Sequence, residues 1–284
     1  MDGAYGEDPF LSRDLLAVFD IVEDFGQIDA NQINASIYDN SDYSAVVLLP
    51  CPHLPCAGIL PPMLTALHSD AEILVIDKPA GLATQPGAGV RISLVEAVER
   101  DFGFRPFLVH RLDKETAGCI VVARDSRMAA KWTELIASRG VRKYYRAAVA
   151  GLPKVARGTF DSPVMVRGEE RDAVTKWRLL GAFGIPEGGA APRFAWLELE
   201  LGTGRTHQIR LQLAAAGLPI LGDESHGNFA LNKELRKSHG LRRLLLQAWR
   251  LELPGGIGVE APLPEHFVSF FAAFADGPGS GGRN

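Results

Sequence analysis

Short apolar runs rich in β-branched residues recur along the chain from Ile73 onward, and they constrain its fold more than any other feature. Each run is bounded by polar or turn-forming residues, as is typical of β-strands. Helix-like segments separate some of the runs but do not alternate with them steadily, which argues against a doubly wound parallel sheet. We therefore predict an α+β fold, with strands at 73–77, 107–109, 119–123, 144–149, 194–201 and 244–253.

Three segments between these runs carry helix signals. We predict helices over 93–102, 126–138 and 206–217. Ser93 and Thr206 stand where the side chain of an N-cap residue accepts a hydrogen bond from the first turn. The helices and strands together account for most of the chain after residue 70.

The composition of the chain changes near residue 69. Residues 1–69 contain ten Asp and Glu and one basic residue, Arg13, whereas the remainder has a net charge of +5. The acidic part has no S4-type RNA-binding pattern, and its local signals are a short helix at 15–22, a strand at 45–49 and a proline-rich segment at 50–62. We expect an acidic extension over 1–69, a main domain over 70–272 and a flexible tail over 273–284.

The charge distribution favours a polyanionic partner. Residues 104–146 contain ten Lys and Arg against four Asp and Glu, which suits a phosphate backbone. A solvated surface of mixed charge is the alternative explanation. The three cysteines are too few for a disulfide scaffold, the acidic N-terminus is unlike a secretory leader, and the longest uncharged stretch carries five prolines. We expect a cytoplasmic protein without a membrane span.

Motifs for nucleotide cofactors and for common hydrolases are absent from the sequence. It contains no phosphate-binding loop, no dinucleotide fingerprint, no H-E-x-x-H zinc motif and no G-x-S-x-G nucleophile elbow. Cys51, His53 and Cys56 offer three metal-ligating side chains, but a fourth ligand is needed, and small buried residues explain this apolar stretch better. We expect neither a metal nor an organic cofactor.

A polar loop between two predicted strands contains the residues best suited to chemistry. Asp113 lies between Arg111 and Lys114, with His110 nearby. Neighbouring cations favour the ionised form of a carboxyl group. An ionised aspartate is a poor general acid but a usable nucleophile or base. The structural alternative is a turn with a surface ion pair.

Two basic clusters elsewhere in the chain could meet this loop. Residues 142–146, RKYYR, lead into a strand, and a tyrosine there could stack on a base or move a proton. Residues 202–210, GTGRTHQIR, open a predicted helix whose N-terminus could bind an anion. Arg205 could pair with Asp113, or Arg205 and Arg210 could both bind phosphates.

These clusters together resemble the RluA-type pseudouridine synthases over roughly residues 71–264. The loop motif HRLDKETAG is highly specific, and several matches occur in the family's order. The RsuA type is less similar, because its short motif lacks the leading His-Arg and the GRTHQIR helix. The matching stretches are ILVIDKPAGL at 73–82, LVHRLDKETAG at 108–118, KYYRAAVAG at 143–151, GRTHQIR at 204–210, GLPILGD at 217–223 and RLLLQA at 243–248.

The resemblance implies an RNA uridine isomerase with a long, bent, mostly antiparallel mixed sheet, flanking helices and a central RNA cleft. It implies that Asp113 is the catalytic aspartate and that Tyr145 stacks on the uracil and removes the proton at carbon 5. Either Arg205 or Arg210 would pair with the aspartate, and we favour Arg205 because it lies nearer the turn. The implied substrate-binding residues are His110, Arg111, Arg210, Arg243 and Leu244. The reaction needs no redox change and no phosphate transfer, in keeping with the absence of cofactor motifs.

Four positions depart from the family pattern. Ala117 stands where serine is common, Gln212 and Gln247 where histidines are common, and His226 where tyrosine is usual. None of them replaces the aspartate, so they bear on the choice of target more than on activity. The likeness of 77–87 and 108–118 to ribosomal members favours large-subunit ribosomal RNA as the target, with transfer RNA as the alternative.

Two other classes of protein remain open at this point. A glycosidase or nucleoside hydrolase would need a second carboxylate, for which Glu115 and Asp223 are candidates. A non-catalytic RNA-binding or ribosome-assembly protein would not need Asp113, Tyr145 and Arg205 together. We expect a monomer that binds RNA, and neither DNA nor a membrane.

Overall fold

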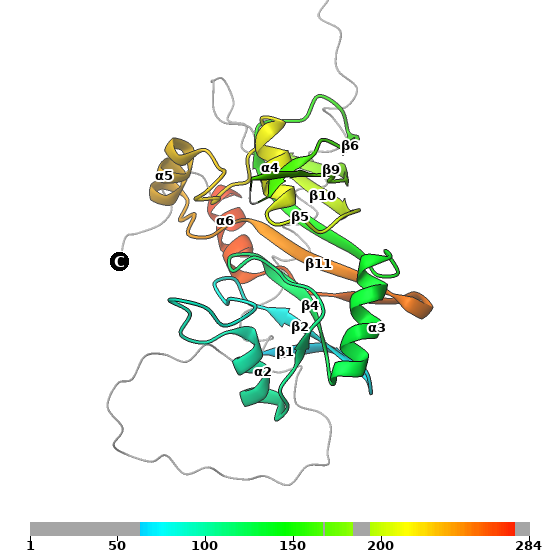
Figure 1. The fold of residues 1–284 in the computed structure, drawn as a ribbon. Coiled ribbons are helices and arrows are strands. Elements are labelled where there is room, and N and C mark those ends of the chain that lie inside the picture. The colour runs from blue at the N-terminus through cyan, green and yellow to red at the C-terminus, as the bar shows by residue number, and fades with distance from the viewer. Residues whose placement is uncertain (1–62, 167, 184–193, 276–284) are drawn as a thin grey trace, which may run out of the picture. The chain divides into compact units, whose positions relative to one another are not determined.

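The strands in the computed structural model form one large mixed sheet (Figure 1). The structure describes residues 63–166, 168–183 and 194–275, and all of these except Met63 lie in a unit that begins at Leu64. Across the sheet, the strands follow the order β1 (Thr65–Ser69), β2 (Ile73–Lys78), β4 (Ala117–Ala123), β11 (Leu246–Leu253), β5 (Arg142–Ala150), β10 (Phe194–Leu201), β9 (Thr175–Phe183) and β6 (Arg157–Phe160). Three further contacts complete the strand pairing: β3 (Phe107–Leu108) joins β4, β12 (Ile257–Glu260) joins β11, and β7 (Val164–Val166) forms a separate hairpin with β8 (Glu169–Arg171).

Among the described strands, only the pairing of β4 with β11 is parallel. The others are antiparallel, so the predicted α+β class with a mostly antiparallel mixed sheet is confirmed. β10 has the predicted bounds, but its first four residues are all buried, and buried and partly buried side chains alternate only over Glu198–Glu200. The strand β1 begins ahead of the domain boundary that composition suggested at residue 69, since the sheet extends to Thr65.

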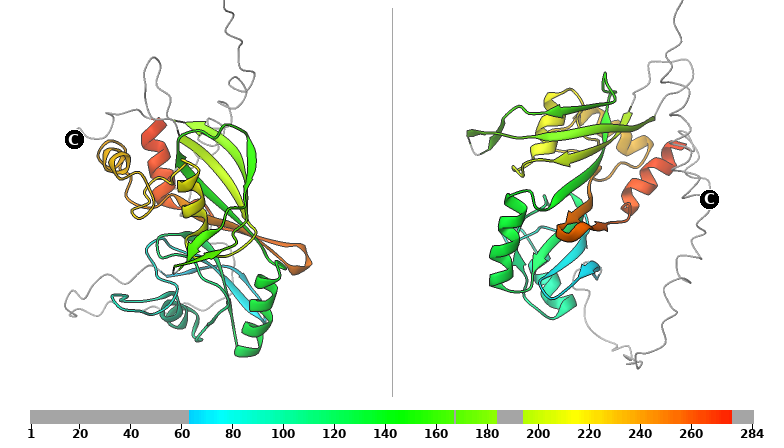
Figure 2. Two further views of the ribbon diagram at one scale, coloured as in Figure 1. Left: turned by 45° about the horizontal axis from the view of Figure 1, so that its top comes forward. Right: turned by 90° about the vertical axis from the view of Figure 1, so that its right-hand side faces the viewer.

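The described part of the chain contains five helices, which lie on both faces of the sheet. One apolar core joins α2 (Leu94–Phe102) and α4 (Gln208–Ala215) to one face of the sheet. A second core packs α3 (Ser126–Ala137) against the other face. Helix α6 (Glu265–Ala275) lies on the opposite side of the upper strands from α4, with Phe267 against Trp196 of β10 (Figure 2). Helix α5 (Phe229–Ser238) follows the turn that ends the 217–223 motif.

The predicted helices are present, but one begins differently. Ser93 caps α2 with a capping box, as expected. Thr206 does not cap α4, because His207 takes the N-cap position in a left-handed conformation and makes no side-chain capping bond. The helix expected at 15–22, the strand at 45–49, the segment at 50–62 and the end of the tail at 276–284 lie outside the described residues. No described helix is long and apolar enough to span a bilayer.

The strand β11 joins the two halves of the sheet. It lies between β4, which belongs to the first half, and β5, which belongs to the second (Figure 1). Gly118 of β4 pairs with Ala248 of β11 and has a φ of 104°. A Cβ atom at Gly118 would lie 2.2 Å from the Ala248 carbonyl oxygen. The glycine therefore allows β4 to approach β11 closely, and this contact fixes where the preceding polar loop lies.

We predict that Gly118→Ala destabilises the protein more than Gly103→Ala does. Both glycines have positive φ, which costs a residue with a side chain about 1–2 kcal/mol. Only Gly118 adds a clash with backbone, since a Cβ at Gly103 meets nothing within 4 Å. Overpacking of this kind adds about 1–3 kcal/mol. The free energy of unfolding from urea titrations measures the difference, and equal losses would contradict the role given to the β4–β11 contact.

Candidate active site

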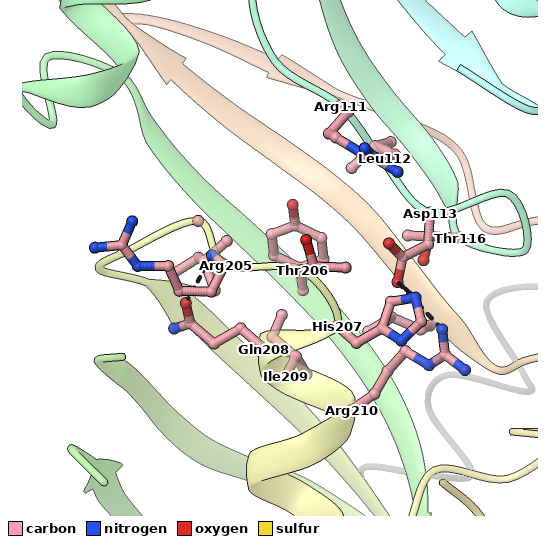
Figure 3. Close-up of a pocket in the computed structure, with 14 residues that line it drawn as sticks. Arg111, Leu112, Asp113, Thr116, Arg205, Thr206, His207, Gln208, Ile209 and Arg210 are labelled. Carbon is pink, nitrogen blue, oxygen red and sulfur yellow. Dashed lines mark hydrogen bonds and ion pairs between the residues drawn. The ribbon is translucent and has the colours of Figure 1, made fainter. Parts of the chain in front are cut away.

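A pocket opens on the face of the sheet that carries α4, at the junction of the two sheet halves (Figure 3). Its floor is apolar and buried, whereas its rim carries exposed residues. Three parts of the chain come together there: the polar loop, β5 with β11, and the turn that enters α4. The lining residues are Arg111, Leu112, Asp113, Thr116, Tyr145, Leu201, Gly204, Arg205, Thr206, His207, Gln208, Ile209, Arg210 and Leu246.

Asp113 is held in this pocket by Arg210 (Figure 3). The Arg210 Nη1 donates to Asp113 Oδ2 at 3.3 Å. The other side of the guanidinium binds Asp223 through two hydrogen bonds, Nε to Oδ2 at 2.7 Å and Nη2 to Oδ1 at 2.8 Å. Arg210 and Asp223 are both buried, so this planar two-bond pair fixes the direction of the guanidinium toward Asp113.

The contacts between Arg210 and Asp223 favour the charged form of both side chains. Burial opposes the charge of Arg210, but its bonds with Asp223 and the charge of Asp113 raise its pKa on balance. Burial likewise opposes ionisation of Asp223, but the bond from Arg210 and the N–H groups of Ser225 and His226 lower its pKa overall. Both groups are therefore charged at neutral pH, and Asp223 cannot act as a general acid.

The preferred partner of Asp113 in our sequence interpretation, Arg205, is not the one that the structure shows. The side chain of Arg205 points away from Asp113 (Figure 3), and its Nε donates to the backbone oxygen of Asp172 at 3.2 Å. Arg205 lies in the exposed turn ahead of α4, whereas Arg210 lies inside the helix. Helical side chains lean toward the N-terminus of their helix, and this tilt carries Arg210 to the polar loop.

Of the other predicted binding residues, some line the pocket and others lie outside its lining. Arg111 lines the pocket and is exposed on its rim. His110 does not line it, because its Nε2 accepts a hydrogen bond from the Val121 N–H at 2.9 Å. Burial, and secondly the charge of Lys143, lower the pKa of His110 to about 3, so the ring is neutral and can accept this bond.

Arg243 and Leu244 also lie outside the pocket lining. Leu244 is buried in the core beneath α4. The Arg243 side chain pairs with Glu115 at 3.4 Å and crosses Gly81 so closely that a Cβ there would lie 2.6 Å from its Nη1. Arg243 therefore contacts the polar loop through Glu115, and Leu244 belongs to the core, so neither forms the pocket.

A buried lysine that we did not predict as a site residue supports the same loop. Lys78 is fully buried, and its Nζ donates to the backbone oxygens of Pro79, Leu82 and Lys114 at 3.1, 2.9 and 3.1 Å. Three acceptors match the three donors of an ammonium group. Burial lowers the pKa of Lys78 to about 7, against the charges of Glu115 and Asp113. The motif at 73–82 thus links the 79–82 turn to the loop that carries Asp113.

Tyr145 lies in the pocket floor on β5. Burial first, and the charge of Asp113 second, raise its pKa above the ordinary value of 10.0, so the phenol is protonated at neutral pH. Leu201, Ile209 and Leu246 also line the pocket. This combination offers an apolar surface beside a single carboxylate, that of Asp113.

The comparison with protein families agrees with this geometry. The family described as RNA pseudouridylate synthase matches residues 72–215, just over half of the chain. The chain belongs to this family. The protein is therefore an RNA pseudouridine synthase, an isomerase whose substrate is RNA, as the sequence motifs indicated.

Named relatives act on two kinds of RNA. Ribosomal large subunit pseudouridine synthase D of Xanthomonas campestris is 36% identical over 240 residues, which cover 75% of this chain and 70% of that protein. The tRNA pseudouridine synthase C of Salmonella typhi is 31% identical over 212 residues, which cover 67% and 80%. Among solved structures, Human RNA Pseudouridylate Synthase Domain Containing 4 aligns with a TM-score of 0.60 at 27% identity, over 74% of this chain and 92% of that one.

The second carboxylate that a glycosidase needs is not available in this pseudouridine synthase. Both oxygens of Asp223 bind Arg210, and Glu115 pairs with Arg243. Among the described residues, no group of three His, Cys, Asp or Glu side chains is arranged to bind a metal. Cys51, His53 and Cys56 lie outside those residues.

Sequence reasoning did not assign site roles to His207, Thr116 and Leu246, which line the pocket. His207 stands inside the GRTHQIR motif and Leu246 inside RLLLQA, so both motifs contained the signal. Asp223 ends the GLPILGD motif, but we considered it only as a second carboxylate. Its pairing with Arg210 could not be seen in the sequence, because it joins a helix to a separate turn.

We predict that Arg210→Gln destabilises this synthase by about 3–5 kcal/mol, because it leaves the buried Asp223 carboxylate without its cation. The matched control is Arg205→Gln, which removes the same charge from an exposed turn. It should change the free energy of unfolding by no more than about 0.5 kcal/mol. Urea unfolding at neutral pH distinguishes the two. Losses of similar size would show that Arg210 does not hold a buried pair.

The Arg210→Gln deficit should also depend on pH. In the native protein the folded pKa of Asp223 lies below the ordinary value of 3.8, so the pair stabilises the protein above that pH, and the contribution is lost as the pH falls through the folded value. Without Arg210, burial should instead raise the folded pKa of Asp223. The variant should then regain part of its stability relative to the native protein between about pH 7 and about pH 5. A deficit that does not change with pH would contradict this.

Proposed function

We propose that this pseudouridine synthase isomerises uridines of large-subunit ribosomal RNA and that Asp113 is its catalytic carboxylate. The observation that carries the catalytic assignment is the ion pair between Asp113 and a buried Arg210 in the described pocket. The ribosomal target is supported by the higher identity to a ribosomal large-subunit synthase, 36%, than to a transfer RNA synthase, 31%.

The proposed chemistry uses one carboxylate. Isomerisation breaks the bond between the uracil nitrogen 1 and the ribose, turns the base, and joins its carbon 5 to the same ribose carbon. Asp113 would attack or deprotonate the ribose and would stabilise the detached state. Arg210 keeps this carboxylate directed into the pocket, because the guanidinium is itself fixed by Asp223.

Tyr145 would stack on the uracil and assist removal of the proton at carbon 5. Its raised pKa means that the free phenol is neutral. A neutral phenol can accept a proton from carbon only if its own proton leaves at the same time. Asp113, which lies in the same pocket and is a free carboxylate again once carbon 5 has joined the ribose, is the candidate acceptor of the Tyr145 proton. The target base must first leave its stack, which costs a few kcal/mol and is easiest in loops and bulges.

The exposed rim of the pocket would bind the RNA backbone. Arg111 and Arg205 lie on this rim and are exposed, so each can contact a phosphate without breaking an ion pair in the protein core. We infer that RNA binding resides in the positively charged domain and that residues 1–69, with a net charge of −9, do not add to the affinity for RNA. We also propose that the protein is a monomer, that it works in the cytoplasm, and that it needs neither a metal nor an organic cofactor.

We predict that Asp113→Asn abolishes pseudouridine formation and leaves RNA binding intact. The amide has the same shape and can still accept a hydrogen bond from Arg210, so the fold should persist. Glu134→Gln on the exposed surface of α3 is the matched control and should keep the native rate. Pseudouridine formation by the Asp113→Asn variant within about tenfold of the native rate would exclude the carboxylate from the chemistry.

Tyr145→Phe should retain stacking and lose the hydroxyl. If the hydroxyl moves the carbon 5 proton, single-turnover rates should fall by about 100- to 10,000-fold while RNA affinity is unchanged. A native rate would limit Tyr145 to a stacking role. A loss of affinity with an unchanged rate would indicate that the hydroxyl binds RNA instead.

The ribosomal target can be tested by mapping. Pseudouridines are located in ribosomal and transfer RNA from a strain that lacks this protein and from the same strain with the gene restored. Loss of sites in large-subunit ribosomal RNA, recovered by the native gene but not by Asp113→Asn, is the expected result. Loss confined to transfer RNA would replace the ribosomal assignment.

RNA affinity should fall steeply with salt, because each phosphate contact releases counterions. Removing residues 1–62 should leave the affinity unchanged or raise it. The cut keeps Leu64, whose N–H donates to Asp101 Oδ2 at 2.8 Å. Circular dichroism must first show that the shortened protein is folded. A folded truncation that binds about tenfold more weakly would show that the acidic part contributes to recognition.

A further inference from the structure

The candidate catalytic aspartate is one of five residues that form a closed ring of polar contacts. Arg210 joins Asp113 to Asp223, as described above, and the Oδ1 of Asp223 also accepts from the His226 backbone N–H at 2.9 Å. The His226 side chain then contacts His207, whose Nδ1 lies 3.0 Å from His226 Nε2. The ring closes where His207 Nε2 lies 3.7 Å from Asp113 Oδ2. One arm of the ring is thus ionic, and the other consists of two imidazoles.

The backbone of His207 shows that its orientation is imposed. His207 has φ 54° and ψ 20°, and Arg139 is the only other described non-glycine residue with positive φ. This conformation costs a residue with a Cβ about 1–2 kcal/mol. It places the imidazole over the pocket, next to Arg210 and Asp113, as Figure 3 shows. Backbone strain of this kind is common at functional sites.

The two nitrogens of His207 face groups of different character. A neutral imidazole has one N–H donor and one acceptor nitrogen. If the acceptor nitrogen faced Asp113, its lone pair would oppose the carboxylate. The electrostatically favoured form carries the proton on Nε2, directed at Asp113. The Nδ1 is then an acceptor, and it requires a donor at the position of His226 Nε2.

We propose that His226 is a positioning residue, which donates its Nε2–H to His207 Nδ1 and thereby directs the His207 Nε2–H at the Asp113 carboxylate. Two N–H groups, one from Arg210 and one from His207, then face the same oxygen, Oδ2. The carboxylate is oriented by contacts on both sides. This inference rests on the proposed catalytic role of Asp113.

The charges around His226 are compatible with this role. Burial lowers the pKa of His226, and the charge of Arg210 lowers it further, against the charges of Asp223 and Asp113. His226 is therefore a neutral donor at neutral pH. It stands where tyrosine is usual in the pattern that the sequence resembles. A tyrosine hydroxyl can donate to the same nitrogen, so two different side chains satisfy one requirement.

The first test needs no RNA. Long-range ¹H–¹⁵N spectra of the full chain, labelled at histidine, report which ring nitrogen carries the proton, and His207→Gln identifies the His207 signals. We expect the proton on His207 Nε2 in the native protein, a mixture of both forms in His226→Phe, and recovery of the Nε2 form in His226→Tyr. His226→Leu replaces the phenylalanine variant if that variant fails to fold. An unchanged His207 proton position in the folded Phe or Leu variant overturns the proposal.

The second test measures single-turnover pseudouridine formation on ribosomal and transfer RNA from the strain that lacks the protein. His226→Phe should lower the rate by about 10- to 100-fold at unchanged RNA affinity, and His226→Tyr should restore it. His239→Phe, a histidine substitution outside the pocket lining, is the control and should keep the native rate. A native rate in His226→Phe, or no recovery in His226→Tyr, overturns the positioning role. An inactive native protein would instead overturn the proposed RNA target and leave the spectroscopic result standing.

Discussion

The buried guanidinium of Arg210 is the interaction on which the arrangement of the site depends. It connects α4, the polar loop and the 223–226 turn through three hydrogen bonds to two carboxylates. The turn is fixed in its own right, since Asn232 of α5 bonds the Gly222 N–H and the Asp223 carbonyl oxygen, each at 3.0 Å. A helix with no residue in the pocket therefore determines where Asp113 points. Buried ion pairs often add little to stability compared with apolar side chains, so we infer that this pair serves mainly to orient Asp113.

The opposite side of the loop is fixed by the Lys78 ammonium group, by a threonine hydroxyl and by a backbone hydrogen bond. Lys78 binds the Lys114 carbonyl oxygen from below, and Gly81 N donates to the same oxygen at 2.8 Å. Thr84 Oγ1 donates to Leu112 O at 2.7 Å. The loop therefore has hydrogen bonds on both sides of Asp113, and little reorganisation is needed when charge moves in the pocket. Preorganised polar surroundings of this kind are a large part of what an enzyme contributes to rate.

Local sequence signals predicted the features whose causes are local. The Ser93 capping box and the bounds of the strand at 194–201 depend on neighbours within a few residues, and both appeared where expected. The choice between Arg205 and Arg210 could not be made in this way. It depends on the helix beginning at Gln208 after a left-handed His207, and on a partner 97 residues away. The short strands β6, β7, β8 and β12 also escaped prediction, because their residues are mostly exposed and have no apolar pattern.

The place of β11 in the sheet has a consequence for how the protein is made. The pocket draws Asp113 from the first half of the sheet and Tyr145 from the second, and the strand between these halves is among the last elements in the chain. During synthesis on the ribosome, β4 and β5 emerge long before residue 246. Until β11 follows, no strand can pair with both of them. Pairings so distant in sequence form slowly, and an open strand edge can pair with other chains meanwhile. Catalytic competence is thus acquired only after β11 has been synthesised, and a chain released before β11 would contain every residue of the Asp113 loop without an active site.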